Sequence, residues 1–379
     1  ALRFARGEEV MSTGGLKAKL ERPLDFLVIA DHSGGLGATK ALYDAPGFLI
    51  RDPTLKRWHT EMHKGPEGMQ RVTGELIDRV GRNTLPAALT NPQSQRKTAT
   101  NIWTSHSTLV ERYNEPGKFT AFMGFEYTLM PGGNNLHRVV MFRDGKSRTD
   151  KVLPYDPGQG DTPVSQLWDY MDNYEKVTGG KVLAIPHNSN LSNGLMFELV
   201  GPDGGPMTAA YARRRAAREP VTEITQIKGT SETHPALSTR DEWAGFELVS
   251  TRGVGMGKPI ASKPEGSYVR EALRHGLELE EQGITNPFAF GFIGSSDTHT
   301  AASQNDESNF SSKLGLLSAD AQTRGSVPVS FLESTLIGFL PGQSVAEVDG
   351  ESYLGSQQTE FGASGLAAVW AEENTRQSI

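Results

Sequence analysis

Cysteine is absent from all 379 residues of the sequence. Disulfide bonds, zinc–thiolate sites and a cysteine nucleophile are therefore excluded. Any metal ion must be held by histidine, aspartate or glutamate side chains. A chain without thiols also fits a periplasmic or secreted location, which we favour slightly over the cytoplasm.

Two other features are scarce, namely long apolar runs and positive charge. No segment approaches the length of a membrane span, and the formal net charge is -7. A nucleic-acid-binding surface would require a basic stripe. The short basic run YARRRAARE (211–219) is interpreted as the solvated face of a helix in preference to a phosphate-binding patch. We predict no membrane span and no nucleic-acid partner, and no sequence feature determines the oligomeric state.

Each end of the sequence has the pattern of a helix that is already under way. ALRFARGEEV at the start is typical of the end of an amphipathic helix, and VWAEENTRQSI at the end continues a helical pattern. We expect that the chain is part of a longer protein.

Apolar runs recur along the chain, and each ends in polar or ionisable residues. They are LDFLVIADH (24–32), FTAFMGFEY (119–127), KVLAIPHNSN (181–190), EITQIKGTSETH (223–234) and FAFGFIGSSDTHT (288–300). Helix-like segments, such as 162–177 and 266–283, lie between them. This alternation predicts a parallel sheet, and ionisable residues at the strand ends predict a (β/α) barrel with its site at that rim.

The last of these runs suggests a metal ion. Asp297 and His299 are two residues apart, so they face one point if the chain stays extended. Taken singly, His32, His187 or His299 is equally well explained as a structural histidine or a helix cap. Together they favour a metal site, because several predicted strands end in such residues at the same rim.

Two other histidine positions are weaker candidates. His59 and His63 have the i, i+4 spacing of a helical zinc pair, but this spacing is common and nothing else in the sequence supports it. His275 lies in the middle of a helix-like segment and has still less support.

Ordered motifs resemble a known family. FLVIADH, GFEY, NLHRVVMF, IPHN and GSSDTH, with RFARGEE (3–9), QIKGTSETH (226–234), SYVREALRHGLELEEQG (267–283) and SGLAAVWAEENTR (364–376), resemble the bacterial DUF3604 proteins. These are a branch of the polymerase-and-histidinol-phosphatase (PHP) superfamily. The resemblance implies an α/β fold, a distorted seven-stranded (β/α) TIM-like barrel, with two or three divalent metal ions, Mn, Fe or Zn, at the C-terminal strand ends.

The resemblance also implies a ligand set. The positions that match the superfamily's metal ligands are His32, Glu126, His137, His187, Asp297 and His299. Glu126 matches the carboxylate that bridges two metals in the superfamily. Asp31 matches a residue that lies outside the ligand set or binds metal only occasionally. His137 follows the Gly-rich stretch PGGNN and is identified by the resemblance alone.

One motif of the superfamily is absent. The His-x-His of the first strand, with an acid or histidine shortly after it, lies upstream of RFARGEE in relatives, and the family continues beyond NTRQSI. The resemblance therefore implies a central portion of the protein, a barrel without its first strand and an incomplete metal site.

This ligand set predicts a phosphoesterase that hydrolyses a phosphate mono- or diester by a metal-bridging hydroxide. Glu126 and Asp297 would hold the metals, Lys228 and His234 would assist catalysis, and Asn188, Arg138 and Glu232 would contact the substrate. A loop hydrogen-bonding role is equally open for Glu232 and His234. No Gly-x-Ser-x-Gly elbow offers a covalent nucleophile.

Two other functions stay open. An amidohydrolase-like enzyme that cleaves C–N or ester bonds would use a similar site, although its carboxylated lysine and motif order are not seen. A catalytically inactive binding module is favoured by the missing His-x-His.

The domain prediction is a single domain over residues 1–379. The segments 33–118 and 191–222 are expected as insertions that wall the site, because stretches such as NPQSQRKTATN (91–101) have the composition of loops.

Overall fold

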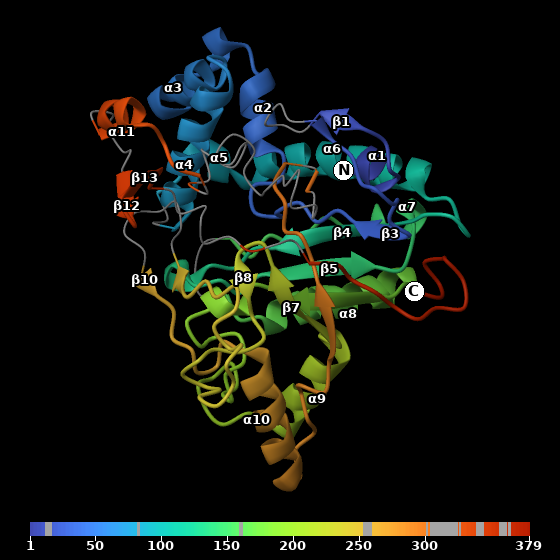
Figure 1. Cartoon of the computed structure of the whole chain (residues 1–379). Coiled ribbons are helices and arrows are strands. Elements are labelled where there is room, and N and C mark those ends of the chain that lie inside the picture. Colours follow the sequence, from blue (N-terminus) through green and yellow to red (C-terminus); the bar gives the residue numbers. More distant parts are fainter. Residues whose placement is uncertain are drawn as a thin grey trace.

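The computed structural model of the chain describes residues 1–11, 17–81, 84–158, 162–252, 260–300, 302–303, 327–338, 345–355 and 365–379, and the single positions 325 and 362 (Figure 1). The helices in these residues are α1 (Leu2–Ala5), α2 (Ala38–Asp44), α3 (Pro53–Met62), α4 (Pro66–Gly81), α5 (Ala87–Thr90), α6 (Pro92–Tyr113), α7 (Lys146–Thr149), α8 (Ser165–Thr178), α9 (Ala209–Arg218), α10 (Val269–Glu281) and α11 (Phe331–Gly338), with the 3-10 turns η1 (Gly47–Leu49), η2 (Pro131–Gly133) and η3 (Ser189–Leu191). None of these helices combines the length and the apolar character that crossing a bilayer requires.

The strands in the described residues are β1 (Val10–Met11), β2 (Lys17–Ala18), β3 (Phe26–Val28), β4 (Thr120–Tyr127), β5 (Arg138–Phe142), β6 (Val182–Pro186), β7 (Val221–Gln226), β8 (Gly229–Thr230), β9 (Thr251–Arg252), β10 (Ile260–Ala261), β11 (Gly291–Gly294), β12 (Val345–Val348) and β13 (Glu351–Leu354). The five apolar runs of the sequence thus contribute β3, β4, β6, β7 and β11, and the helices expected at 162–177 and 266–283 are confirmed as α8 and α10.

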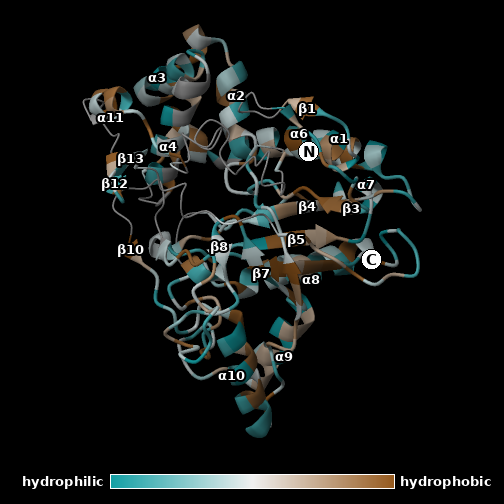
Figure 2. Cartoon of the chain, viewed as in Figure 1, coloured by the Kyte–Doolittle hydropathy of each residue, from teal (hydrophilic) through white to brown (hydrophobic). Residues whose placement is uncertain are grey.

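A central sheet holds four of the described strands in the order β3-β4-β5-β6. β3 and β4 are parallel, whereas β5 is antiparallel to both β4 and β6, with Glu126 opposite Val139 and Arg138 opposite Pro186. Every residue of β4 is buried, as expected for a strand covered on both faces. Figure 2 shows hydrophobic colour gathered around β4, β5 and α8 in the middle of the molecule.

A second sheet has the order β11-β7-β8 in the described residues, with β11 and β7 parallel. β7 lies beside β6, because the Thr222 hydroxyl donates to the Pro186 carbonyl at 3.2 Å and the Asn188 amide donates to Glu223 at 3.0 Å. The two sheets are therefore linked at this edge by side-chain hydrogen bonds.

The predicted seven-stranded barrel is wrong. The described residues form a mixed α/β structure with several small, separate sheets, none of which closes into a barrel. The prediction failed because strand alternation with helices was taken to mean parallel pairing. Between Tyr127 and Arg138 the chain has only the turn η2 and no crossover helix, and such a short connection joins antiparallel strands.

Helices α6 and α8 build the main core on the central sheet. The Phe125 ring of β4 lies 6.4 Å from Trp103 of α6 and 5.8 Å from Tyr170 of α8, measured between ring centroids. A second cluster, which includes residues of α9, α10 and the segment before β11, shares the partly buried Leu136 and Tyr211 with the first. The single domain over residues 1–379 stays a prediction.

The segment 33–118 is helical where loops were predicted. NPQSQRKTATN lies at the start of α6, with Pro92 as its first residue and the Asn91 side chain accepting from the Gln93 amide at 3.1 Å. The polar and proline-rich composition is thus that of a helix start. The basic run 211–219 is helical as expected, since it falls largely within α9.

The final described segment, 365–379, is not the helix that its pattern suggested. Its first residues pair with β11: the Gly365 amide donates to Ser295 at 2.7 Å, and the Gly294 amide donates to Leu366 at 3.1 Å. The backbones approach so closely that a Cβ on Gly365 would lie 2.7 Å from the Cα of Gly294.

The same segment then reaches the beginning of the central sheet. The Asn374 amide nitrogen donates to the carbonyls of Asp25 at 2.9 Å and Lys118 at 3.1 Å, and its oxygen accepts from the buried Thr120 hydroxyl at 2.6 Å. Asn374 therefore joins the starts of β3 and β4.

We predict that Asn374→Ala lowers the free energy of unfolding by about 1 to 3 kcal/mol, because it leaves the polar atoms of Thr120 and two carbonyls without their partner. Urea denaturation measures this loss. Glu373→Ala, at the exposed neighbouring position, is the control and should change stability little. Equal stability of the two variants would contradict the bridging role of Asn374.

Candidate metal centre

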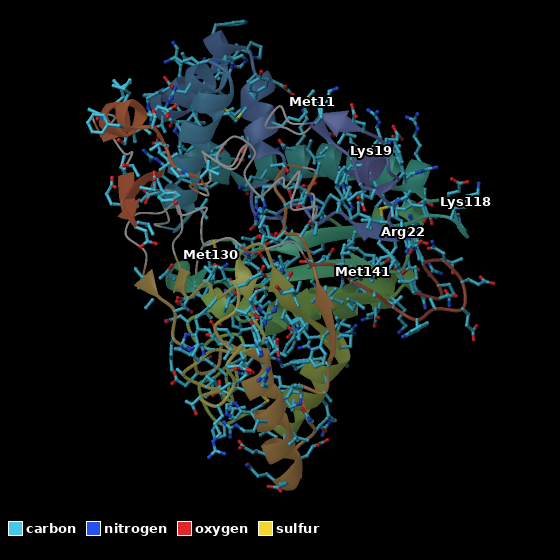
Figure 3. All side chains as sticks on the ribbon, viewed as in Figure 1. Met11, Lys19, Arg22, Lys118, Met130 and Met141 are labelled. Atoms are coloured by element: carbon cyan, nitrogen blue, oxygen red, sulfur yellow. The ribbon has the colours of Figure 1, made fainter. Side chains whose placement is uncertain are left out.

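Three strand ends meet at one end of the central sheet. In Figure 3, Lys118 marks the end where β4 begins and Met130 the end that β4 runs toward. Because β5 is antiparallel to both neighbours, it starts at the Met130 end, and β6 finishes there. Glu126 near the end of β4, His137 just before β5 and His187 just after β6 are therefore brought together.

The ligand atoms of Glu126, His137 and His187 all lie within 4.8 Å of one another. His137 Nδ1 is 2.7 Å and His187 Nε2 is 3.2 Å from the same oxygen, Glu126 Oε1. All three side chains are buried. This is the one group of three or more such ligands found in the described residues.

The ring nitrogens of the two histidines support a metal ion. His137 Nε2 and His187 Nδ1 are buried and have no hydrogen-bond partner among the described residues, whereas the other nitrogen of each ring faces Glu126. Buried polar atoms without partners are rare and call for an explanation. One carboxylate with two imidazoles is a donor set that suits Zn, Mn or Fe.

The charges of Glu126 and His137 match this use. Burial lowers the pKa of His137 to about 4, so its imidazole is neutral at neutral pH. Burial would raise the pKa of Glu126, but the charges of His32 and His187 and the neighbouring imidazoles hold it well below its usual value, so the carboxylate is ionised. An ionised carboxylate and a neutral imidazole are the metal-binding forms.

His32 and His299 lie beside this group. His32 Nδ1 is 3.4 Å from Glu126 Oε2 and 2.6 Å from the Thr128 hydroxyl. The His32 ring is 6.0 Å from that of His137 and 5.6 Å from that of His299, measured between centroids. The rings of His32 and His299 thus extend the cluster on its exposed side, where both residues are accessible to solvent.

Asp297 approaches the cluster from β11, but not on an extended strand. β11 ends at Gly294, and Asp297 has a left-handed φ of 48°. The chain is therefore not extended here, and the prediction that Asp297 and His299 face one point as alternate residues of a strand does not apply. The Asp297 carboxylate lies 2.8 Å from Lys228 Nζ, and its charge helps to raise the pKa of His187. Asp297 and Lys228 are therefore placed at the margin of the cluster.

Two of the predicted substrate contacts are engaged elsewhere. Arg138 is buried, and its guanidinium binds Glu219 at 3.0 Å and the Leu136 carbonyl at 2.7 Å. Since side chains alternate along a strand, Arg138 points away from the side that His137 faces. Glu232 is exposed and paired with Arg270.

Asn188 was predicted to contact the substrate and His234 to assist catalysis, but both side chains form other hydrogen bonds. Asn188 is fully buried, its amide oxygen accepts from Asn135 at 2.8 Å, and its amide nitrogen donates to Asn190 at 2.8 Å. Both ends are thus occupied, and no group is left for a substrate. His234 Nδ1 accepts from the Ala236 amide at 3.0 Å, which is the loop hydrogen bond that was left open.

The other histidines do not join the cluster. The rings of His59 and His63 are tilted by 39° with their centroids 4.3 Å apart, and His63 Nδ1 lies 2.8 Å from the His59 carbonyl. His275 Nε2 lies 2.9 Å from its neighbour Arg274. His106, which sequence reasoning did not select, stacks on Trp103, with Nδ1 4.0 Å from Asp31.

A buried acid was missed altogether. Glu223 lies inside β7, and its carboxylate accepts from the Asn188 amide and the Ser295 hydroxyl. The signal in the sequence was an acid within a run of β-branched residues, VTEIT, a run that is typical of a strand.

The comparisons with known proteins identify a family but no individual relative. The model of the family described as "Protein of unknown function (DUF3604)" matches residues 1–379. No curated protein and no solved structure matches the chain.

We predict that the protein binds Mn²⁺ or Zn²⁺ and that Glu126→Gln, which keeps the shape and removes the charge, weakens binding more than the roughly 10- to 100-fold loss typical of outer-shell changes. Calorimetric titration and elemental analysis of the purified protein measure this. His59→Ala is the control and should bind metal as the parent does. An unchanged affinity in Glu126→Gln would exclude this centre.

The affinity should also fall as the pH is lowered. Burial lowers the pKa of His187, but the charge of Glu126 outweighs it, so the net shift is upward and a bound metal must displace a proton below that pKa. His137, with a pKa of about 4, adds no proton near neutrality. Titrations between about pH 6 and 8 should therefore show a loss approaching about tenfold per pH unit at the acid end. An affinity that is independent of pH would contradict a role for His187.

Proposed function

The chain belongs to the DUF3604 family, and we propose that it is a metal-dependent hydrolase of phosphate mono- or diesters, of the PHP type. The observation that carries the proposal is the buried group of Glu126, His137 and His187, whose donor atoms converge and whose ring nitrogens lack other partners. The barrel is not part of the proposal.

The proposal extends to more than one metal ion. Glu126, His137 and His187 would hold the first, and His32, Asp297 and His299 offer donors for one or two more, as the PHP resemblance implies. Bound divalent ions of the Mn, Fe or Zn type would supply an activated water and positive charge for the phosphate oxygens.

The chain's own residues would orient and charge the site. The Lys228 ammonium, held 2.8 Å from Asp297 and only 14% exposed, is a cation at the margin of the cluster and would bind a phosphate oxygen. Asp297 fixes its position. The burial of Glu126, His137 and His187 excludes bulk water from one side of the site, which strengthens these electrostatic contacts.

The test is hydrolysis of p-nitrophenyl phosphate and bis(p-nitrophenyl) phosphate by the Mn²⁺-loaded protein. We expect turnover by the parent and a loss of about 100-fold or more in Asp297→Asn, because the substitution removes a charged metal donor and the carboxylate that holds Lys228 in place. Circular dichroism checks that the variant folds, and His59→Ala serves as a control with parent activity.

The other outcomes separate the alternatives. Parent-like hydrolysis by Asp297→Asn would show that this cluster is not the catalyst. Cleavage of amide substrates without phosphoester hydrolysis would favour an amidohydrolase-like enzyme. A folded, metal-loaded parent that is inert toward both classes would favour a binding module.

A further inference from the structure

Glu223 is a buried carboxylate in β7, and it has no role in the proposed reaction. It is 1% exposed, and burial raises its pKa. Within the described part of the chain no arginine or lysine forms an ion pair with it, and its partners are hydrogen-bond donors. The charge of His187 lowers this pKa but does not outweigh the burial. Burying an acid is costly, so its hydrogen bonds must serve a purpose that a hydrophobic residue could not.

The two oxygens of Glu223 reach to opposite sides of β7. Oε1 accepts from the backbone amide of Asn188 at 3.0 Å, and Oε2 accepts from the Ser295 hydroxyl. Asn188 directly follows His187 after β6, and Ser295 lies two residues before Asp297 after β11. The carboxylate thus spans the ends of the two strands that flank β7.

Asn188 extends this connection to a third segment. Its backbone is left-handed, with φ 54° and ψ 39°, and its side-chain oxygen accepts from Asn135, two residues before His137. Ser295, Glu223, Asn188 and Asn135 therefore form one hydrogen-bonded chain. This chain runs alongside the segments that carry Asp297, His187 and His137.

We propose that Glu223 is a positioning residue of the metal centre: its two hydrogen bonds hold the strand ends that carry His187 and Asp297 at the spacing that metal binding requires. This inference rests on the proposed metal-dependent function. Glu223 acts through Asn188 and Ser295, because both of its oxygens already accept from protein donors.

Two substitutions separate hydrogen bonding from charge. Glu223→Gln keeps an oxygen that accepts from Asn188 and gains an amide that donates to the Ser295 hydroxyl, so both ties survive without the charge. Glu223→Ala removes both ties. Asp144→Ala is the matched control, because the buried Asp144 carboxylate also accepts from a backbone amide, that of Lys181 at 2.7 Å, and from a hydroxyl, that of Tyr174 at 3.0 Å, but just before β6, at the end away from the metal centre.

Two measurements are made on each variant. Mn²⁺ titration should show affinity close to the parent in Glu223→Gln and Asp144→Ala, and a loss of about tenfold or more in Glu223→Ala, the size typical of outer partners of metal ligands. Hydrogen–deuterium exchange of the metal-free proteins should show faster exchange at the Asn188 amide in Glu223→Ala, but not in Glu223→Gln.

The remaining outcomes overturn the inference in distinguishable ways. Equal loss of affinity in Glu223→Gln and Glu223→Ala would show that the charge acts, not the hydrogen bonds. Parent affinity in Glu223→Ala, or an equal loss in Asp144→Ala, would remove the special role of Glu223 while the metal centre stands. A parent that binds neither Mn²⁺ nor Zn²⁺ would overturn the metal centre, and the positioning role with it.

Discussion

The structure depends on one buried charge. Glu126 is an ionised carboxylate in β4, a strand with no exposed residue. Such a charge is stable only if donors or cations surround it. His32, His137 and His187 lie within 3.4 Å of its oxygens, and each comes from a different segment. The need to compensate this carboxylate therefore fixes where the ends of β3, β5 and β6 must lie.

The sequence predicted where strands lie along the chain, but it did not predict how neighbouring strands run relative to one another. The apolar runs that end in His32, Glu126 and His187 are strands, because alternating or continuous apolar residues are a local property. Strand direction depends on the length of the connection and on tertiary pairing, and the antiparallel β5 was not foreseen. For the same reason the strand-end argument missed His137, which lies before a strand and not after one.

Single residues near the site show where adjacency in the sequence misleads. Arg138 and Asn188 are adjacent to ligand candidates and were therefore expected at the substrate, yet Arg138 is paired with Glu219 and Asn188 is enclosed by amides. Adjacency in sequence does not determine which way a side chain points. Glu223 was overlooked because an acid in a strand suggests an exposed position until the neighbouring strands are known.

The segment 365–379 has a consequence for the order of assembly. Asn374 binds Asp25 and Thr120, which precede it by 349 and 254 positions. Contacts between such distant residues are slow to form, because a large loop must close before they stabilise anything. During synthesis the starts of β3 and β4 leave the ribosome long before their partner exists. These strand ends should therefore be the last part of the central sheet to be protected, and the step most exposed to aggregation or to assistance by chaperones.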